Sequence, residues 1–439
     1  MNYLKVSEVL LKYSKPSIFQ TMSKMAMDNN ALNFGQGFPN WTVPDIILDS
    51  LKNQIHKNDL DNHLYSFGSK FLLEAIQDEY SPLLNQNLQW DQNIIISAGA
   101  TSILGYIFMS SKPSDEIIVM EPFFPWYQTP FELFKGVVKF VRIKEQPDNS
   151  LDVNFDEIAS LCNEKTKYII INSPQNPSGK LFNEQHFEAL KKILDKHKNI
   201  VILSDEVYER VVFNKKPFPR LANYKDLWNR TISIFSGGKT YSCTGWRVGW
   251  AIGPANLIEP LKELQRITNN HTIGVLMNAM AQSIVDSNKP YKGYATYYEY
   301  LSEIFNENKK LLIDIFNKSK LEFHVIEPEG GHFIIVGIRK SITKMPLKYF
   351  YEEGSNTDEN KLKTFDDWRM LENTHFAPDE AFCAYLTKEY KITPIPCSAF
   401  YFKSDDKNKN DDEIYSYIRF AICKAKEDII LLDKYLNSN

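Results

Sequence analysis

Short apolar runs alternate with helix-favouring stretches between about residues 45 and 285. Seven of these runs are rich in β-branched residues and predict strands, at residues 93–97, 116–120, 137–141, 168–172, 200–204, 231–235 and 248–252. Between several of them lie longer stretches that favour helices, for example residues 183–197. Apolar runs without polar alternation are typical of parallel strands covered on both faces. The pattern therefore predicts an α/β fold around a mostly parallel, seven-stranded sheet.

The pattern changes after about residue 286. A long helix is predicted over residues 291–320, followed by a turn and a strand at residues 332–338. We interpret this part as a connecting helix and a smaller α+β domain. The predicted organisation is an N-terminal arm (1–45) that joins the small domain, a large domain (46–290) and a C-terminal domain (291–439) with an inserted loop near 340–378.

Composition narrows the class of protein. The chain has 439 residues, 43% of them hydrophobic, and a net charge of -4, so nucleic acid or an anionic membrane is not an expected partner. Five scattered cysteines form no C-x-x-C and fit a reducing compartment, and no H-x-x-x-H spacing predicts a metal. With no signal peptide and no apolar run of about 20 residues, we expect a cytoplasmic protein, with the mitochondrion left open.

Polar residues follow three of the predicted strands, where parallel α/β sheets bind ligands. Gly99, Ala100 and Thr101 precede a helix, whose N-terminus favours an anion, although a tight turn without a ligand explains them equally well. Asn176 lies in a turn-rich segment and either initiates a turn or points its amide at a ligand. Asp205 follows an apolar strand; it is either a helix N-cap or a buried carboxylate that needs a cation.

The most specific segment is Ser236-Gly237-Gly238-Lys239-Thr240, directly after the strand at residues 231–235. A single lysine is usually a solvated surface group. Lys239, however, lies among small and hydroxyl residues, with Arg247 eight positions later. This arrangement suits an amine that acts as a nucleophile beside an anion site.

In order and spacing, these segments resemble the class I/II aminotransferases of the fold-type I pyridoxal-phosphate (PLP) family, and more narrowly the kynurenine aminotransferase/glutamine transaminase K group. The sequence segments shared with this family are Asn33-Phe34-Gly35-Gln36-Gly37-Phe38-Pro39, Glu121-Pro122-Phe123-Phe124 and Arg419-Phe420-Ala421. The resemblance covers about residues 30–340 and 380–430. It implies a fold-type I transferase with PLP as cofactor.

The resemblance also implies roles for single residues. Lys239 forms the Schiff base and moves the substrate proton, while Asp205 keeps the pyridine nitrogen protonated. Tyr208 and Asn176 bond the phenolic oxygen of the ring, and Phe124 stacks on its face. The phosphate is held by Gly99, Ala100, Thr101, Ser236 and Arg247. The substrate is bound by Gly37, Asn176 and Arg419, and Arg419 binds its carboxylate. Tyr65 reaches the phosphate of a neighbouring subunit, which implies a homodimer with shared sites.

The activity implied is a ping-pong transfer of an amino group from an L-amino acid, large neutral or aromatic, to a 2-oxo acid. Two departures leave the donor open, because Ala100 and Ile273-Gly274 stand where the kynurenine-type enzymes carry aromatic and histidine side chains. Trp41 and Tyr65 are candidates to restore part of this aromatic lining. The same residues also fit two alternative reactions. One is that of a cysteine-conjugate β-lyase, and the other is that of an amino-acid oxidase. A non-catalytic PLP-fold regulatory module is the remaining alternative.

Overall fold

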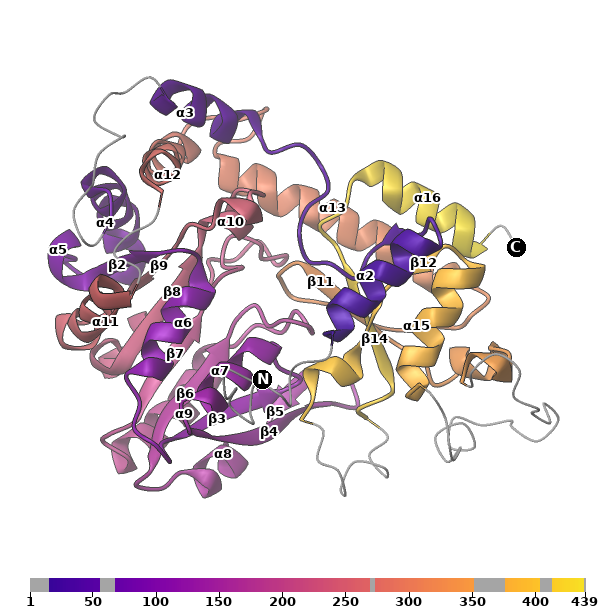
Figure 1. Ribbon diagram of the computed structural model, residues 1–439, viewed down its shortest axis with the longest axis horizontal. Coiled ribbons are helices and arrows are strands. Elements are labelled where there is room, and N and C mark those ends of the chain that lie inside the picture. Colours follow the sequence, from indigo (N-terminus) through magenta and orange to yellow (C-terminus); the bar gives the residue numbers. More distant parts are fainter. Residues whose placement is uncertain (1–15, 56–67, 269–272, 351–375, 403–412, 438–439) are drawn as a thin grey trace, which may run out of the picture.

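The computed structural model describes residues 16–55, 68–268, 273–350, 376–402 and 413–437. Its largest element is an eight-stranded sheet, in the order β2-β9-β8-β7-β6-β3-β4-β5 (Figure 1). The strands are β2 (Ile94–Ser97), β3 (Glu116–Glu121), β4 (Val137–Glu145), β5 (Leu151–Val153), β6 (Thr166–Asn172), β7 (Val201–Asp205), β8 (Thr231–Ser236) and β9 (Gly249–Ile252).

The seven predicted strands are confirmed, each within a few residues of its expected bounds. Strands β4, β3, β6, β7 and β8 are mutually parallel, whereas β9 is antiparallel to both of its neighbours. The eighth strand, β5, escaped prediction because it has three residues and only pairs back onto the end of β4.

Helices cover both faces of this sheet, which is why its strands lack polar alternation. Odd-numbered residues of β3, such as Ile117, face the cluster that includes α6 (Ala100–Met109) and α11 (Ala255–Thr268). Even-numbered residues, such as Ile118, face the cluster with α8 (Phe155–Leu161) and α9 (Glu184–Lys196). The remaining helices of this part are α3 (Asp45–Ile55), α4 (Lys70–Leu84), α5 (Trp90–Asn93), α7 (Thr129–Leu133), α10 (Gly237–Thr240) and α12 (Gly274–Ser287).

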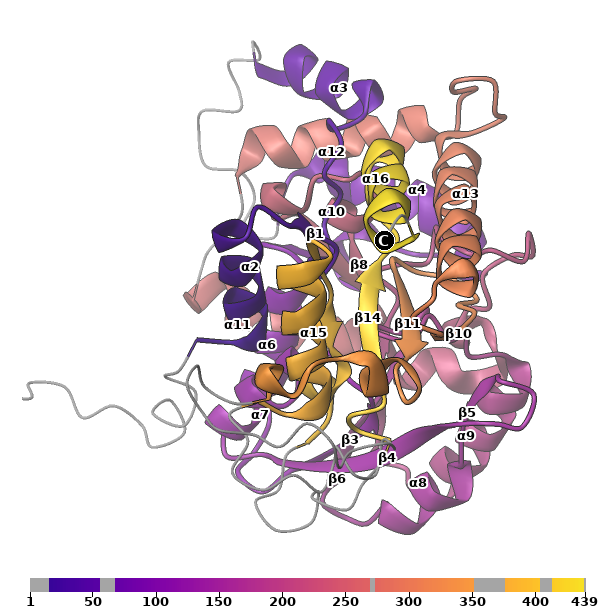
Figure 2. The same ribbon diagram turned by 90° about the vertical axis from the view of Figure 1, so that its right-hand side faces the viewer.

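A second, smaller sheet lies beside the first (Figures 1 and 2). It has four antiparallel strands in the order β10 (His324–Ile326), β11 (Phe333–Gly337), β14 (Tyr417–Ala421) and β13 (Ile395–Pro396). The long helix α13 (Tyr297–Lys318) leads into it, and α15 (Pro378–Glu389) and α16 (Lys426–Asn437) pack around it. The predicted boundary near residue 290 falls between α12 and α13.

The N-terminal segment packs against this smaller part. Helix α2 (Ile18–Asp28) contacts α15, and β1 (Leu32–Asn33) pairs in parallel with β12 (Ile392–Thr393). The predicted inserted loop near 340–378 differs at its start, where residues 341–350 form short 3-10 turns and bury Ile342, Leu347 and Phe350. Residues 351–375 of that segment lie outside the described ranges.

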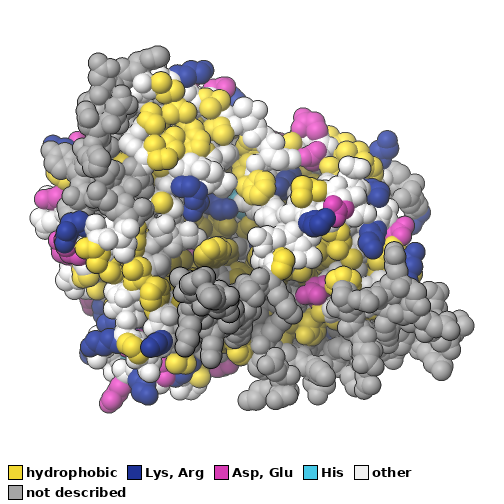
Figure 3. Space-filling view, in the orientation of Figure 1, with side chains coloured by type: hydrophobic (Ala, Val, Ile, Leu, Met, Phe, Trp, Pro, Cys, Tyr) yellow, Lys and Arg dark blue, Asp and Glu magenta, His cyan; other side chains and the backbone are white. Residues whose placement is uncertain are grey.

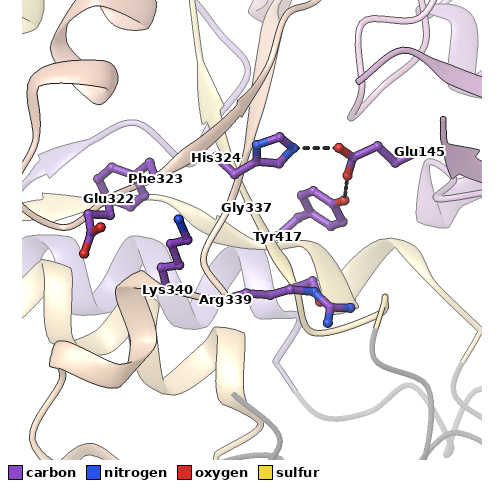
Figure 4. Close-up of a pocket in the computed structure, with 9 residues that line it drawn as sticks. Glu145, Glu322, Phe323, His324, Gly337, Arg339, Lys340 and Tyr417 are labelled. Carbon is purple, nitrogen blue, oxygen red and sulfur yellow. Dashed lines mark hydrogen bonds and ion pairs between the residues drawn. The ribbon is translucent and has the colours of Figure 1, made fainter. Parts of the chain in front are cut away.

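One acidic side chain ties the two sheets together. Glu145, at the end of β4, accepts a contact from His324 Nε2 at 2.6 Å and a hydrogen bond from the Tyr417 hydroxyl (Figure 4). Gly337 lies between these two residues in the register of the small sheet, so their rings flank a hollow of about 360 Å³. These contacts hold the first residues of β10 and β14 against the large sheet.

No helix in the part of the chain that the structure describes is long and apolar enough to cross a membrane.

Candidate active site

The register of the large sheet brings the polar strand ends together. Asn172 lies opposite Asp205, and Gly249, at the start of β9, lies opposite both Ser97 and Ser236. A cavity of about 390 Å³ opens at this edge. Its lining includes the sequence-predicted residues Gly37, Ala100, Thr101, Phe124, Asn176, Asp205, Tyr208, Ser236, Lys239, Arg247 and Arg419.

Two predicted residues are not among those that line the cavity. Gly99 lies next to Arg247, with φ at +87°. A Cβ atom built on it would come within 2.5 Å of Arg247 Nη2, so only glycine leaves room for that guanidinium. Tyr65 lies outside the described residues.

One end of the cavity is suited to an anion. The Arg247 Nη2 atom donates to the Ala98 carbonyl at 3.3 Å and to Thr101 Oγ1 at 3.2 Å, which places its charge beside the N-terminus of α6. Among the described residues, no carboxylate is within ion-pair distance of this guanidinium. A fixed cation and the free N–H groups of a helix N-terminus form an anion cradle. Figure 3 shows basic side chains beside the hollow in this face of the molecule.

Asp205 lies at the carboxyl end of β7 and is 4% exposed. The Tyr127 hydroxyl donates to its Oδ2 atom, and the Val207 N–H donates to Oδ1 at 3.4 Å. Because a turn and not a helix follows β7, the helix N-cap alternative is wrong. Burial raises the pKa of Asp205 to about 6, and the Tyr127 bond opposes that shift. Within the described ranges, Asp205 has no cationic partner, so it is available to a positively charged group of a ligand.

Lys239 follows the end of β8 and lines the cavity. Its Nζ atom donates to the Gly37 carbonyl at 2.7 Å and lies 5.7 Å from the centre of the Tyr208 ring. Burial lowers the pKa of Lys239 to about 8, with the positive charges of Arg419 and Arg247 acting in the same direction. A lysine with a lowered pKa has more free amine at neutral pH and is a better nucleophile.

Arg419 comes from the middle of β14 and is 2% exposed. Its Nη1 atom donates to Asn176 Oδ1 at 2.8 Å, its Nη2 atom donates to the Gly35 carbonyl, and its guanidinium lies 3.9 Å from the Phe333 ring centre. The Nε atom has no partner among the described residues. Burial lowers the pKa of Arg419 to about 10. A rigid, desolvated guanidinium of this kind is suited to a carboxylate.

Several lining residues escaped the sequence analysis. Tyr127, which bonds Asp205, and Trp126 follow the end of β3, so the same strand-end rule that found Asp205 could have found them. Phe19 and Phe38 reach the cavity from the N-terminal segment. Phe38 lies in a segment shared with the family but was given no role, and no local signal marks Phe19. Trp41, considered as aromatic lining, instead packs edge-on against Phe305. Ile273 is 63% exposed and does not line the cavity.

No group of three or more His, Cys, Asp or Glu side chains is arranged to hold a metal ion within the described ranges. Among the residues that the structure describes, three cations line the cavity, Lys239, Arg247 and Arg419, against the single carboxylate of Asp205. Its charge therefore favours an anionic ligand that also carries one positively charged group.

Comparison with known proteins agrees with this geometry. Residues 23–428 match the family described as aminotransferase class I and II. A kynurenine–oxoglutarate transaminase of Dictyostelium discoideum is 30% identical, over 93% of this chain and 91% of its own. Kynurenine–oxoglutarate transaminase 3 of Mus musculus is 29% identical, over 94% and 86%.

Solved structures share the fold. Bna3p of Saccharomyces cerevisiae, described as a candidate kynurenine aminotransferase, superposes with a TM-score of 0.83 at 25% identity, covering 99% of this chain and 98% of its own. YbdL of Escherichia coli superposes with a TM-score of 0.81 at 24% identity, over 99% and 100% of the two chains. The chain belongs to the class I and II aminotransferases, enzymes of the PLP-dependent fold-type I group that transfer an amino group to a 2-oxo acid.

Proposed function

We propose that this enzyme binds PLP in the 390 Å³ cavity and transfers amino groups from large neutral or aromatic L-amino acids, of the kynurenine type, to a 2-oxo acid. One observation carries the proposal: a lysine amine, a buried carboxylate, an anion cradle and a buried arginine converge on one space. These groups match the aldehyde, ring nitrogen and phosphate of the cofactor and the carboxylate of a substrate. Bound PLP supplies an aldehyde that exchanges one amine for another and a ring that withdraws electrons from the substrate α-carbon.

Different residues of the chain bind the different groups of the cofactor. Arg247, Ser236 and the N-terminus of α6, with Gly99, Ala100 and Thr101, hold the phosphate. Asp205 carries the negative charge that keeps the ring nitrogen protonated, because this buried carboxylate has no cationic partner among the described residues. Phe124 packs against the ring, and Tyr208 and Asn176 donate to its oxygen.

Arg419 and the Gly37 backbone bind the α-carboxylate of the amino acid, which orients its α-carbon toward Lys239. The Lys239 amine then moves the proton at that carbon, a role for which its lowered pKa suits it. Asn176 accepts a hydrogen bond from Arg419 and so fixes the guanidinium that binds the substrate carboxylate.

The lining favours a donor with an uncharged side chain. After Lys239, Arg247 and Arg419 are assigned, no further cation lines the described part of the cavity, whereas Phe19, Phe38, Leu104 and Trp126 do. The two curated relatives are named for kynurenine, an aromatic amino acid, and for oxoglutarate. Because Ala100 leaves space on α6 that a larger residue would fill, bulky side chains fit this wall.

The proposed assembly is a homodimer in which Tyr65 contacts the phosphate of the other subunit. An apolar patch over α3 and α12 supports it (Figure 3). Ile55 and Ile273, at the ends of these helices, are 58% and 63% exposed, which is unfavourable for two large side chains unless a second subunit covers them. The proposed compartment is the cytoplasm, supported by five free thiols of which four are buried.

The test is a spectroscopic titration followed by a half-reaction screen. PLP added to the apoprotein is expected to give the absorbance of a lysine Schiff base, and the Lys239→Ala variant is expected not to. Each of the twenty amino acids is then added to the wild-type complex without an acceptor. Loss of the Schiff-base band with large neutral or aromatic donors supports the proposal, and full turnover by Lys239→Ala contradicts it.

A further inference from the structure

His332 is a buried titratable residue that none of the steps above uses. It directly precedes β11, is 1% exposed, and packs between two rings, with centroid distances of 4.7 Å to Tyr208 and 4.6 Å to Phe305. Within the described ranges, neither ring nitrogen has a hydrogen-bond partner of ordinary geometry. Buried polar atoms are normally paired, so two unpaired nitrogens on one ring need an explanation.

The Gly37 backbone belongs to the same cluster of side chains, because the His332 ring lies 6.4 Å from the Phe333 ring, which closely approaches Gly37. Burial and the charge of Lys239 hold the pKa of His332 well below its usual value, and the Gly37 backbone acts in the opposite direction. Raising the pKa of a histidine is the effect of a carbonyl that faces a ring N–H. The Gly37 carbonyl also accepts the hydrogen bond of Lys239 Nζ, at 2.7 Å. Lys239 thus engages this oxygen, while the unpaired His332 ring and the Lys239 amine both lie beside the Tyr208 ring, at 4.7 Å and 5.7 Å from its centre.

We infer that His332 is a positioning residue that donates a hydrogen bond to the Gly37 carbonyl when Lys239 releases it. This inference rests on the proposed function, because Lys239 must leave that oxygen to bond the cofactor. A neutral imidazole has one N–H donor and can make this bond without adding a charge beside Lys239. The bond keeps the segment around Gly37 in place while its N–H side receives the substrate carboxylate.

The position of Gly37 makes its placement sensitive. A Cβ atom on this residue would come within 2.2 Å of Phe333 Cζ, and Phe333 in turn lies against the Arg419 guanidinium at 3.9 Å. A shift of the Gly37 backbone therefore disturbs the ring that supports the carboxylate-binding arginine. A carbonyl left without a donor favours such a shift.

The test uses hydrogen–deuterium exchange of the peptide that contains Gly37 and needs no turnover. His332→Phe keeps an aromatic ring of similar size but has no donor, whereas His332→Gln retains a polar N–H as a matched control. In the apoprotein, Lys239 holds the carbonyl, so all three proteins are expected to exchange alike. With PLP bound, exchange in His332→Phe is expected to be about tenfold faster than in wild type, and His332→Gln is expected to restore most of the protection.

A second measurement works without the cofactor. Lys239→Ala removes the first donor, and His332 is expected to maintain protection in that variant. The double variant Lys239→Ala/His332→Phe removes both donors, so its peptide is expected to exchange about tenfold faster than that of either single variant, a coupling that a double-mutant cycle measures.

The outcomes separate the two proposals. If His332→Phe speeds exchange equally with and without PLP, or if the double variant shows no coupling, the role of His332 is overturned and the residue serves only packing. If the wild type forms no Schiff base but the double variant shows the coupling, the proposed cofactor chemistry fails while the backbone contact stands. In the loaded enzyme, His332→Phe is expected to raise the KM for the donor about tenfold with a smaller effect on kcat, since substrate placement is what is lost.

Discussion

Tyr127 donates its hydroxyl to Oδ2 of Asp205, at the base of the cavity where two strands of the large sheet end. The bond joins the segment after β3 to the end of β7. It opposes the burial that raises the pKa of Asp205 to about 6. It therefore keeps Asp205 charged, which is the state in which that residue can hold a protonated ring nitrogen.

Tyr127→Phe is expected to weaken PLP binding. Loss of the hydroxyl removes a hydrogen bond to a charged group, worth about 1.5–3 kcal/mol, or roughly a factor of ten or more in affinity. Because the bond lowers the pKa of Asp205, its loss moves that pKa above about 6 and shifts the acid limb of the binding curve to higher pH. Absorbance titrations between pH 5 and 8 measure both effects. Phe124→Leu is a useful comparison, since it should weaken binding without moving the acid limb.

The capture of PLP by the apoprotein is expected to depend on pH through Lys239. The free amine is the nucleophile, and the pKa of Lys239 is lowered to about 8 by burial and neighbouring cations. The second-order rate is therefore expected to rise with pH up to about 8 and then level off, whereas a solvated lysine would continue to gain up to about 10.4. Stopped-flow absorbance measures the profile. A rate still rising tenfold per pH unit above 9 would contradict this account.

Arg419→Lys is expected to impair recognition of the substrate carboxylate. Lysine keeps the charge but loses the planar donor pair, the bond to Asn176 and the stacking on Phe333. A cost of about 2 kcal/mol corresponds to a roughly 30-fold loss in kcat/KM. Comparing each amino acid with the amine that lacks its carboxylate isolates the effect, because the preference for the acid is expected to shrink by a similar factor. An unchanged preference would place the carboxylate elsewhere.

Mixed dimers test the proposed role of Tyr65. Tyr65→Phe and Lys239→Ala each impair catalysis in their own homodimers. If Tyr65 acts on the neighbouring subunit, a mixed dimer contains one site with both Lys239 and Tyr65 intact. Mixing the two variants under conditions that exchange subunits is then expected to restore up to about a quarter of wild-type activity, since statistical mixing yields half hybrids with one working site each. No recovery, despite hybrids detected by native mass spectrometry, would place Tyr65 in its own subunit's site.

Glu145→Gln is expected to loosen the contact between the two sheets without changing cofactor binding. The substitution removes the charge that faces His324 and weakens the acceptor for Tyr417 (Figure 4). Since the His324 side chain is 46% exposed, the loss is at most about 1 kcal/mol, or about 1–2 °C in Tm for a protein of this size. Glu74→Gln, which removes an exposed helix pair with Lys70, is a control expected to leave Tm unchanged.

The sequence by itself determined the large sheet and the chemistry along its edge. Each predicted strand was marked by a local run of apolar residues, and Asp205 and Lys239 were marked by following such runs, so both could be found without knowing what lies beside them. The family resemblance then assigned Arg419 to the same site, although it lies 180 or more residues from Lys239 and Asp205 along the chain. No spacing in the sequence indicates that these residues lie together.

Only the tertiary structure decided which groups bond one another. The pairing of Tyr127 with Asp205, the bond of Lys239 to the Gly37 carbonyl, and the contact of Glu145 with His324 each join segments far apart in sequence. Trp41 illustrates the same limit, since it was considered for the cavity and packs against Phe305 instead. Periodicity fixes which face of an element is buried, but the partner of a buried side chain depends on how the elements are packed, and that is decided by the whole chain.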